Sequence, residues 1–120
     1  MHIITLLLIL LVILIHTYIM VFEMFLWQSR GPKIFRSFPK SLFAQTKAMA
    51  ANQGLYNGFL AAGLVWGLMI SDDTWQHNVS LCFLLFVLIA GIYGAITVEK
   101  RILYVQSVPA ALAILALLFL

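Results

Sequence analysis

Polar residues inside otherwise apolar stretches are the groups in this sequence that could do chemistry. His16 and Glu23 are seven residues apart in the first stretch, so a helix places them on one face, with Trp27 one turn further along. The other candidate ligand-binding residues come from three later stretches and are Asn52, Gln53, Tyr56, Asn57, Tyr93 and Gln106. No nucleophile motif occurs, and we assign no catalytic residue.

These polar groups gather at one depth. Glu23, Gln53 and Tyr93 lie five positions, and Gln106 four, from the ends of their stretches that meet basic connectors, or about 6–8 Å, while His16 is much deeper. Burying an unpaired carboxylate costs several kcal/mol, so ionisable residues inside membranes face the protein interior and often mark function. The pattern predicts a polar cavity open to the cytoplasmic side; an equally weighted alternative is a buried polar network that fixes helix register.

The composition indicates which kind of element must position these groups. The chain has 120 residues, of which 64% are hydrophobic and 9% charged, and its mean hydropathy is +1.08. Soluble domains have about 25% charged residues. We therefore expect an all-α integral membrane four-helix bundle, formed by a single transmembrane domain over residues 1–120, with spans at about 2–28, 48–70, 79–98 and 102–120. The first apolar stretch has neither the basic start nor the cleavage site of a signal peptide.

The connectors carry nearly all the charge and predict the orientation. The connector over residues 29–47 and the short turn over residues 99–101 together hold all seven Lys and Arg residues, whereas the connector around Asp72 and Asp73 has none. Basic connectors stay in the cytoplasm. We expect both termini on the extracytoplasmic side, in a single orientation.

The loop over residues 29–47 also predicts a partner. Phe35, Phe38 and Phe43 are interleaved with its basic residues, which is typical of a segment that lies in the headgroup layer and attracts anionic lipids. Binding of nucleic acid is not expected at this position. Pro32 and Pro39 argue against one uninterrupted helix, although the pattern from about residue 40 can be helical and continuous with the second span.

Small residues at four-residue steps predict close helix contacts. Gly54 and Gly58 lie on one face of the second span, and Gly63 and Gly67 on another. Such spacing lets two helix backbones approach closely. We favour packing within one bundle, with a homodimer through the glycine-rich faces as the alternative. Pro109 is expected to disturb the fourth span.

Several classes of chemistry lack their motifs. Cys82 is the only cysteine, which excludes an intramolecular disulfide and a dithiol redox site. The three histidines, His2, His16 and His77, do not have the spacing of metal ligands. We therefore expect no metal and no cofactor.

Three strings within the polar segments resemble the small bacterial membrane proteins grouped as domain of unknown function 1304. They are Glu-Met-Phe-Leu-Trp at 23–27, Ala-Ala-Asn-Gln-Gly-Leu-Tyr-Asn-Gly-Phe at 50–59 and Ala-Gly-Ile-Tyr-Gly-Ala at 90–95, and residues 101–106 with Pro109 fit the same pattern. The resemblance covers most of the chain, from about residue 16 to 109. It implies a four-helix protein of the bacterial cytoplasmic (inner) membrane and supplies no reaction.

Three functions remain open on the sequence. We favour a membrane protein that binds or transports a small cationic or amphipathic ligand, with Glu23 as the proton or cation site and with Trp27, Tyr56 and Tyr93 as an aromatic wall. One alternative is a membrane enzyme that acts on a lipid-soluble substrate through acid–base chemistry of His16 and Glu23. Another is a non-catalytic subunit or assembly factor.

Overall fold

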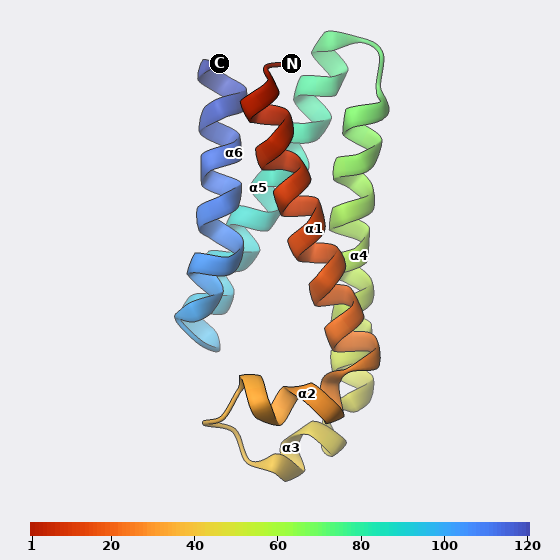
Figure 1. The fold of residues 1–120 in the computed structure, drawn as a ribbon, viewed down its shortest axis with the longest axis vertical. Coiled ribbons are helices and arrows are strands. Elements are labelled where there is room, and N and C mark those ends of the chain that lie inside the picture. The colour runs from red at the N-terminus through yellow and green to blue at the C-terminus, as the bar shows by residue number, and fades with distance from the viewer. The chain divides into compact units, whose positions relative to one another are not determined.

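The computed structural model describes all residues, 1–120, and consists of helices without any strand (Figure 1). This confirms the predicted all-α class. The helices, in chain order, are α1 (Ile3–Phe25), α2 (Trp27–Ile34), α3 (Lys40–Gln45), α4 (Lys47–Met69), α5 (Asp73–Thr97), the π-helical segment η1 (Leu103–Ser107) and α6 (Val108–Phe119). They form two compact units, which are described separately: a first unit of Met1–Ile15 and Leu60–Leu120, and a second unit of His16–Phe59.

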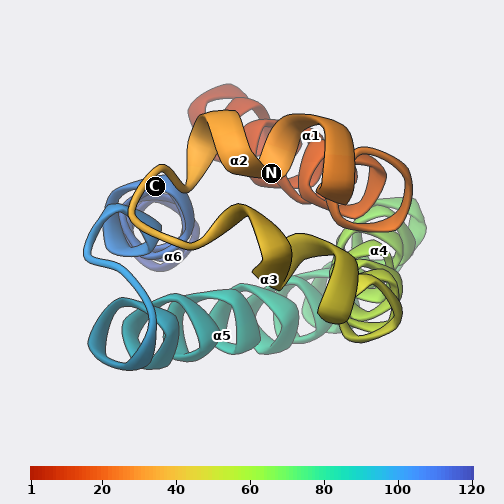
Figure 2. The same cartoon turned by 90° about the horizontal axis from the view of Figure 1, so that it is seen from below.

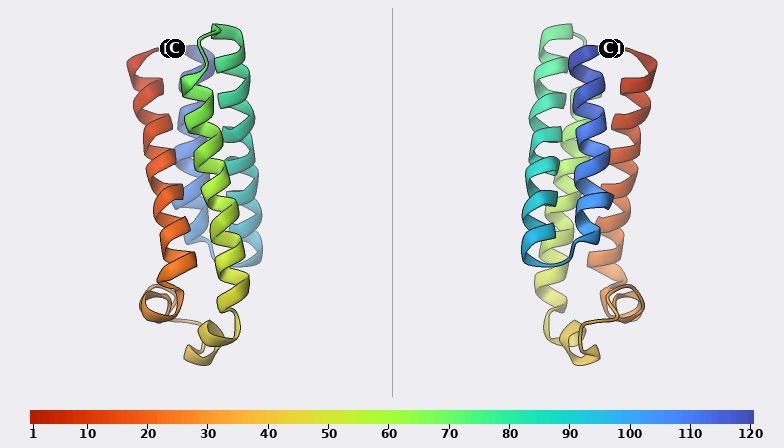
Figure 3. Two further views of the ribbon diagram at one scale, coloured as in Figure 1. Left: turned by 90° about the vertical axis from the view of Figure 1, so that its right-hand side faces the viewer. Right: turned by 90° about the vertical axis from the view of Figure 1, so that its left-hand side faces the viewer.

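The first unit is built from the start of α1, the end of α4, and all of α5, η1 and α6. Its core takes side chains from each of these α-helices: the fully buried residues are Ile9, Val12, Leu64, Leu84, Val87, Ala110 and Ala113. The alanines of α6 recur at a three-residue step and give that helix one narrow, small-residue face. As Figure 3 shows, α5 and α6 run side by side in opposite directions. A single apolar core therefore holds four helices together.

Close contacts in the first unit occur where glycine leaves room. A Cβ atom on Gly63 would collide with the Phe83 ring, and one on Gly67 would lie 2.9 Å from Ser80 Oγ. These glycines contact side chains of the same chain, as packing within one bundle requires. A homodimer through glycine-rich faces stays a prediction.

The start of α5 differs from the sequence prediction, which put the third span at residue 79. Asp72 caps the helix because its carboxylate accepts a hydrogen bond from Trp75 N at 2.9 Å, and the helix begins at Asp73. The Gln76 side chain then donates to the carbonyl oxygens of Leu68 and Ile70, at 3.2 and 3.3 Å, where α4 ends. Capping thus adds a polar turn that a hydropathy pattern does not show.

The fourth apolar stretch is also less regular than predicted. It opens with the π-helical segment η1 (Leu103–Ser107), directly before Pro109 in the first turn of α6. Proline has no N–H to donate to the preceding turn, so a wider turn is accommodated here. The Ser107 hydroxyl donates to the Leu88 carbonyl of α5 at 3.0 Å, at a point where a Cβ on Gly91 would collide with that hydroxyl.

In the second unit the first predicted span is shorter than expected. α1 ends at Phe25, and a break at Leu26 separates it from α2, which contains Trp27 and Pro32. α3 follows, capped by Pro39 and next to α2, as Figure 2 shows. The connector is therefore two short helices: Pro39 directly precedes the second, whereas Pro32 lies within the first.

The second predicted span begins close to its expected position. α3 ends at Gln45 and α4 begins at Lys47, because Thr46 lies between them with ψ of 11°. The Thr46 hydroxyl donates to the Leu42 carbonyl at 2.7 Å. The expected continuous helix from residue 40 is interrupted at this one position.

Two helices, α1 and α5, are long and apolar enough to cross a membrane. α4 has 23 residues, but Asn52, Gln53 and Asn57 lower its hydropathy, and the apolar stretch Leu103–Phe119 is shorter. By length and composition, the structure thus contains two candidate membrane spans rather than the four expected from the sequence.

Candidate ligand-binding site

The polar centre of the second unit is a hydrogen bond between α1 and α4. The Asn57 side-chain amide donates to Glu23 Oε1 at 2.7 Å and also to the Gln53 carbonyl of its own helix at 3.2 Å. Asn57 is buried and Glu23 is half-buried. No Lys, Arg or His nitrogen lies within 4.0 Å of the Glu23 carboxylate, since the single side-chain ion pair of the chain joins Arg101 and Glu99. The carboxylate thus has an amide donor and no cationic partner.

Two glycines of α4 bring this amide within reach of α1. A Cβ on Gly54 would lie 2.8 Å from Met24 Cγ and 3.1 Å from the Met20 carbonyl oxygen. A Cβ on Gly58 would lie 2.5 Å from Met20 Sδ. The helices can approach this closely only without side chains at those positions. The four-residue step of the glycines therefore sets the separation across which Asn57 reaches Glu23.

The residue that pairs with Glu23 is not the one that the sequence puts at the same depth. Those depths put Gln53 level with Glu23, whereas the structure pairs Glu23 with Asn57, which is four residues further along α4, or about 6 Å. α1 ends at Phe25, two residues beyond Glu23, while α4 begins ten residues before Asn57. The two helices thus do not start from a common level, because α2 and α3 fill the turn between them.

The remaining candidates on α4 are exposed and make no hydrogen bond to Glu23. Asn52 and Gln53 are exposed, and Tyr56 is 54% exposed, with its ring edge against Phe59 at a centroid distance of 6.0 Å. Asn57 is therefore the one predicted α4 residue that the structure brings to the carboxylate.

Trp27 lies in an aromatic cluster rather than in an open wall. Its ring contacts Phe22, Phe35 and Phe43 at centroid distances of 5.6, 5.9 and 5.0 Å, and its Nε1 donates to Thr46 Oγ1 at 3.0 Å. The sequence predicts that Phe35 and Phe43 anchor the loop in the headgroup layer. The structure buries Phe43 to 1% exposure, and half-buries Phe35, because the loop folds back on Trp27.

The last three candidates are His16 in the second unit and Tyr93 and Gln106 in the first. His16 is fully buried, seven residues before Glu23 on α1, and about 10 Å of helical rise separates the two. In the first unit, Tyr93 is 69% exposed and Gln106 is half-buried within η1. A cavity shared by all of the candidate residues stays a prediction.

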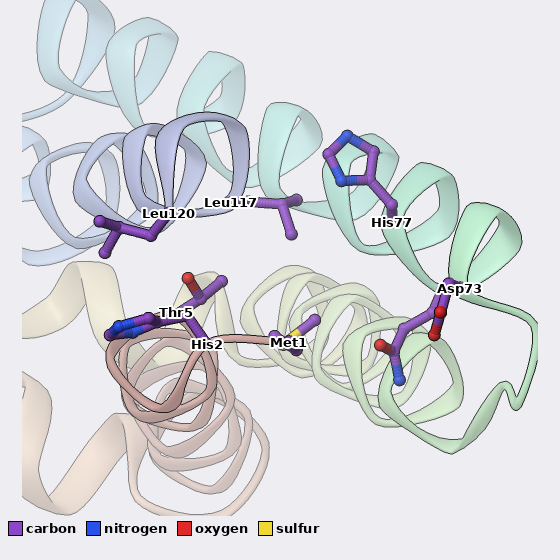
Figure 4. Close-up of a pocket in the computed structure, with 8 residues that line it drawn as sticks. Met1, His2, Thr5, Asp73, His77, Leu117 and Leu120 are labelled. Atoms are coloured by element: carbon purple, nitrogen blue, oxygen red, sulfur yellow. The ribbon is translucent and has the colours of Figure 1, made fainter.

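A polar hollow that the sequence did not predict lies in the first unit (Figure 4). It has a volume of about 290 Å³ and is lined by Met1, His2, Thr5, Asp73, Gln76, His77, Leu117 and Leu120. Both termini therefore lie at the same end of this unit as the start of α5. No three His, Cys, Asp or Glu side chains anywhere in the chain are close enough together to hold a metal ion.

Three further residues shape the site and were not singled out as functional. Met20 and Met24 fill the space beside Gly54 and Gly58, and Thr46 holds the Trp27 indole. A sequence signal for the two methionines was available: flexible methionines on one helix opposite glycines on another are typical of tight helix contacts.

Comparison with known proteins gives a family and no activity. The family described as "Protein of unknown function (DUF1304)" matches residues 10–118. The uncharacterized protein YpaA of Lactococcus lactis subsp. lactis (strain IL1403) is 31% identical over 121 aligned positions, which cover 99% of this chain and 100% of that protein. No solved structure matches the chain. The resemblance drawn from the three sequence strings is thereby confirmed.

Proposed function

This chain belongs to the DUF1304 family of proteins of unknown function, and from its own residues we propose that it is a small integral membrane protein that binds a cationic or amphipathic ligand at Glu23 and Asn57. Three observations support the proposal: the apolar surface of its helices, the distribution of its charges, and the carboxylate that lacks a cationic partner.

The apolar surface supports a place in the membrane. Only 22% of the most apolar window of α1, and of α5, is buried within the chain, and Leu14 and Ile96 are 67% and 79% exposed. Soluble monomers rarely expose large contiguous apolar patches. Core helices of soluble proteins are mostly buried, so these two helices fit a lipid environment better than a water-exposed one.

The shared core extends this proposal to four spans. The end of α4 that belongs to the first unit, and α6, pack into the same core as α1 and α5, through Leu64 and Ala113 respectively. If α1 and α5 cross the bilayer, α4 and α6, which share their core, cross it as well. The buried amide of Asn57 is then shielded from lipid.

The charges support one orientation. In the first unit Asp73 lies at the end with both termini, whereas Lys100 and Arg101 follow the other end of α5. The basic residues of the loop over 29–47 are all exposed. The positive-inside rule then places both termini outside and that loop in the cytoplasm, where it meets anionic lipid headgroups. In a bacterium this membrane is the cytoplasmic one.

The ligand chemistry rests on the hydrogen bond between Asn57 and Glu23, which is the observation that carries the proposal. The amide holds one carboxylate oxygen at 2.7 Å, and no protein cation lies within 4.0 Å. A positively charged ligand supplies the missing countercharge, and its apolar part is compatible with the surrounding methionine side chains. The half-burial of Glu23 leaves it partly accessible.

The test is the binding of a lipophilic cation, tetraphenylphosphonium, to the purified full chain in detergent. We expect saturable binding that Glu23→Gln weakens by at least about tenfold, because it removes the charge and keeps the side-chain shape. Glu99→Gln is the matched control, since Glu99 is already paired with Arg101 at 3.4 Å. Equal binding by the wild type and Glu23→Gln would refute the proposal, and so would an equal loss in Glu99→Gln.

A further inference from the structure

An apolar groove in the first unit runs along the end of α5 and the start of η1. Its volume is about 510 Å³, within the range of about 300–1,000 Å³ that is typical of ligand pockets. It is lined by Ile92, Ala95, Ile96, Lys100, Leu103 and Tyr104. The groove is thus apolar along its length, with one ammonium group and one phenol at the end where α5 turns into η1.

The shape of the groove follows from the packing of α5 against η1. Directly before η1, Ile102 packs on α5 at Gly94, where a Cβ would lie 3.1 Å from Ile102. Ile92 and Ile96 are four residues apart on α5, so they share one face of that helix, and both are exposed. Because this contact uses glycine, the two backbones come close. Ile92 and Ile96 of α5 and Leu103 and Tyr104 of η1 form the walls of the groove.

Lys100 gives the groove its charge. Its neighbour Arg101 pairs with Glu99 at 3.4 Å, so the one nearby carboxylate already has a countercharge. No carboxylate lies within 4.0 Å of the Lys100 ammonium, and the Tyr104 hydroxyl makes no hydrogen bond within the chain. Two donors, one of them cationic, are therefore free beside an apolar channel.

We propose that this groove binds one anionic phospholipid, with an acyl chain along Ile92, Ile96 and Leu103 and with the phosphate at Lys100 and Tyr104. Lysine and tyrosine at the end of a membrane span commonly lie at headgroup level, and the apolar walls then lie at the depth of the chains. The π-helical turn before Pro109 places Tyr104 at this level. The proposal rests on the membrane location in the proposed function and is independent of ligand binding at Glu23.

The experiment is native mass spectrometry of the full chain in detergent, with added phosphatidylglycerol or phosphatidylcholine. We expect the wild type to retain one phosphatidylglycerol more strongly than phosphatidylcholine. Lys100→Gln is expected to lower that retention about fivefold, which corresponds to the contribution of one lysine near an anionic surface. Lys100→Arg, which keeps the charge at the same position, is the matched control and should leave retention unchanged.

A second variant tests the apolar part of the site. Ala95→Trp fills the groove and keeps Lys100, so it should release the lipid without a change of net charge, while Lys100→Arg should retain it. Unchanged helicity by circular dichroism shows that each variant is folded.

Three results would overturn the proposal: retention of phosphatidylglycerol by both Lys100→Gln and Ala95→Trp, an equal loss in Lys100→Gln and Lys100→Arg, or a dimer in the spectra that Ala95→Trp dissociates. The last result would make a second copy of the chain the occupant. If the chain binds tetraphenylphosphonium through Glu23 but retains no phosphatidylglycerol, the groove proposal alone fails.

Discussion

Asn57 on α4 donates a 2.7 Å hydrogen bond to Glu23 on α1, and this bond joins two residues 34 positions apart in the sequence. Both belong to the second unit, where Gly54 and Gly58 hold the two helices close to each other. An amide that satisfies half of a carboxylate stabilises the helix pair and leaves the other oxygen available. The same two residues therefore matter for folding and for the proposed ligand binding.

Replacing Asn57 by leucine should destabilise the protein. The substitution removes the donor and leaves the carboxylate half-buried without its hydrogen bond, which costs about 1–3 kcal/mol. The free energy of unfolding in detergent, followed by circular dichroism during titration with sodium dodecyl sulfate, measures the effect. Asn52→Leu, at an exposed position of the same helix, should stay within about 0.5 kcal/mol of the wild type. Equal effects of the two substitutions would contradict the stabilising role of the bond.

Alanine at the two glycines of α4 should have unequal effects. At Gly58 the new Cβ first meets Met20 Sδ, the flexible end of a side chain, and the gain in helix propensity of about 1 kcal/mol offsets the crowding. At Gly54 it meets Glu23 Cβ at 3.0 Å and the Met20 carbonyl oxygen at 3.1 Å, which cannot move away separately from the helix. We expect Gly54→Ala to cost about 1–3 kcal/mol and to weaken cation binding. If Gly58→Ala proves the more harmful variant, the helix contact is not as described.

Removing the Phe43 ring should loosen the connector between α1 and α4. The ring packs on Trp27 and against Gly31 at 1% exposure, and loss of a buried phenylalanine costs about 3–5 kcal/mol. Phe43→Ala should therefore speed tryptic cleavage after the basic residues of the connector, measured by mass spectrometry of the digest. Phe25→Ala removes a ring that is largely exposed and serves as the control. A cleavage rate that does not change in Phe43→Ala would place this ring in the lipid headgroups instead.

The orientation can be tested by cysteine labelling in intact bacterial cells. In a background with Cys82→Ser, Asp73→Cys should react with a membrane-impermeant maleimide added outside, and Lys40→Cys should react only after the cells are permeabilised. Both positions are exposed, so accessibility within the protein does not differ between them. Labelling of both positions in intact cells would show dual orientation, and the reverse pattern would invert the topology.

Transport, as distinct from binding, requires a flux measurement. In liposomes that contain the reconstituted chain, a pH gradient should drive movement of tetraphenylphosphonium if Glu23 exchanges protons for the cation. Glu23→Gln should abolish that component and leave the passive leak unchanged. A wild-type flux equal to that of empty liposomes would restrict the proposed function to binding.

Much of the secondary structure follows from the apolar runs, because a long run of apolar residues without strand alternation favours a helix wherever it is buried or in lipid. The predicted ends fail where short-range features of the chain decide them. α5 starts at Asp73 because Asp72 caps it, and α1 stops at Phe25 because the chain turns at Leu26. Neither the Asp72 cap nor the turn at Leu26 changes the hydropathy of its segment.

The sequence by itself determined the helical class, the family, the charge asymmetry of the connectors, and Glu23 as the one carboxylate inside an apolar stretch. Only the tertiary structure decided that Asn57 rather than Gln53 faces Glu23, and that Trp27 packs on Phe43. Both amides lie on α4, four residues apart, so periodicity cannot separate them. The choice depends on the axial offset of the two helices, which is set by the contacts of Gly54 and Gly58 with the methionines and by the fold of α2 and α3.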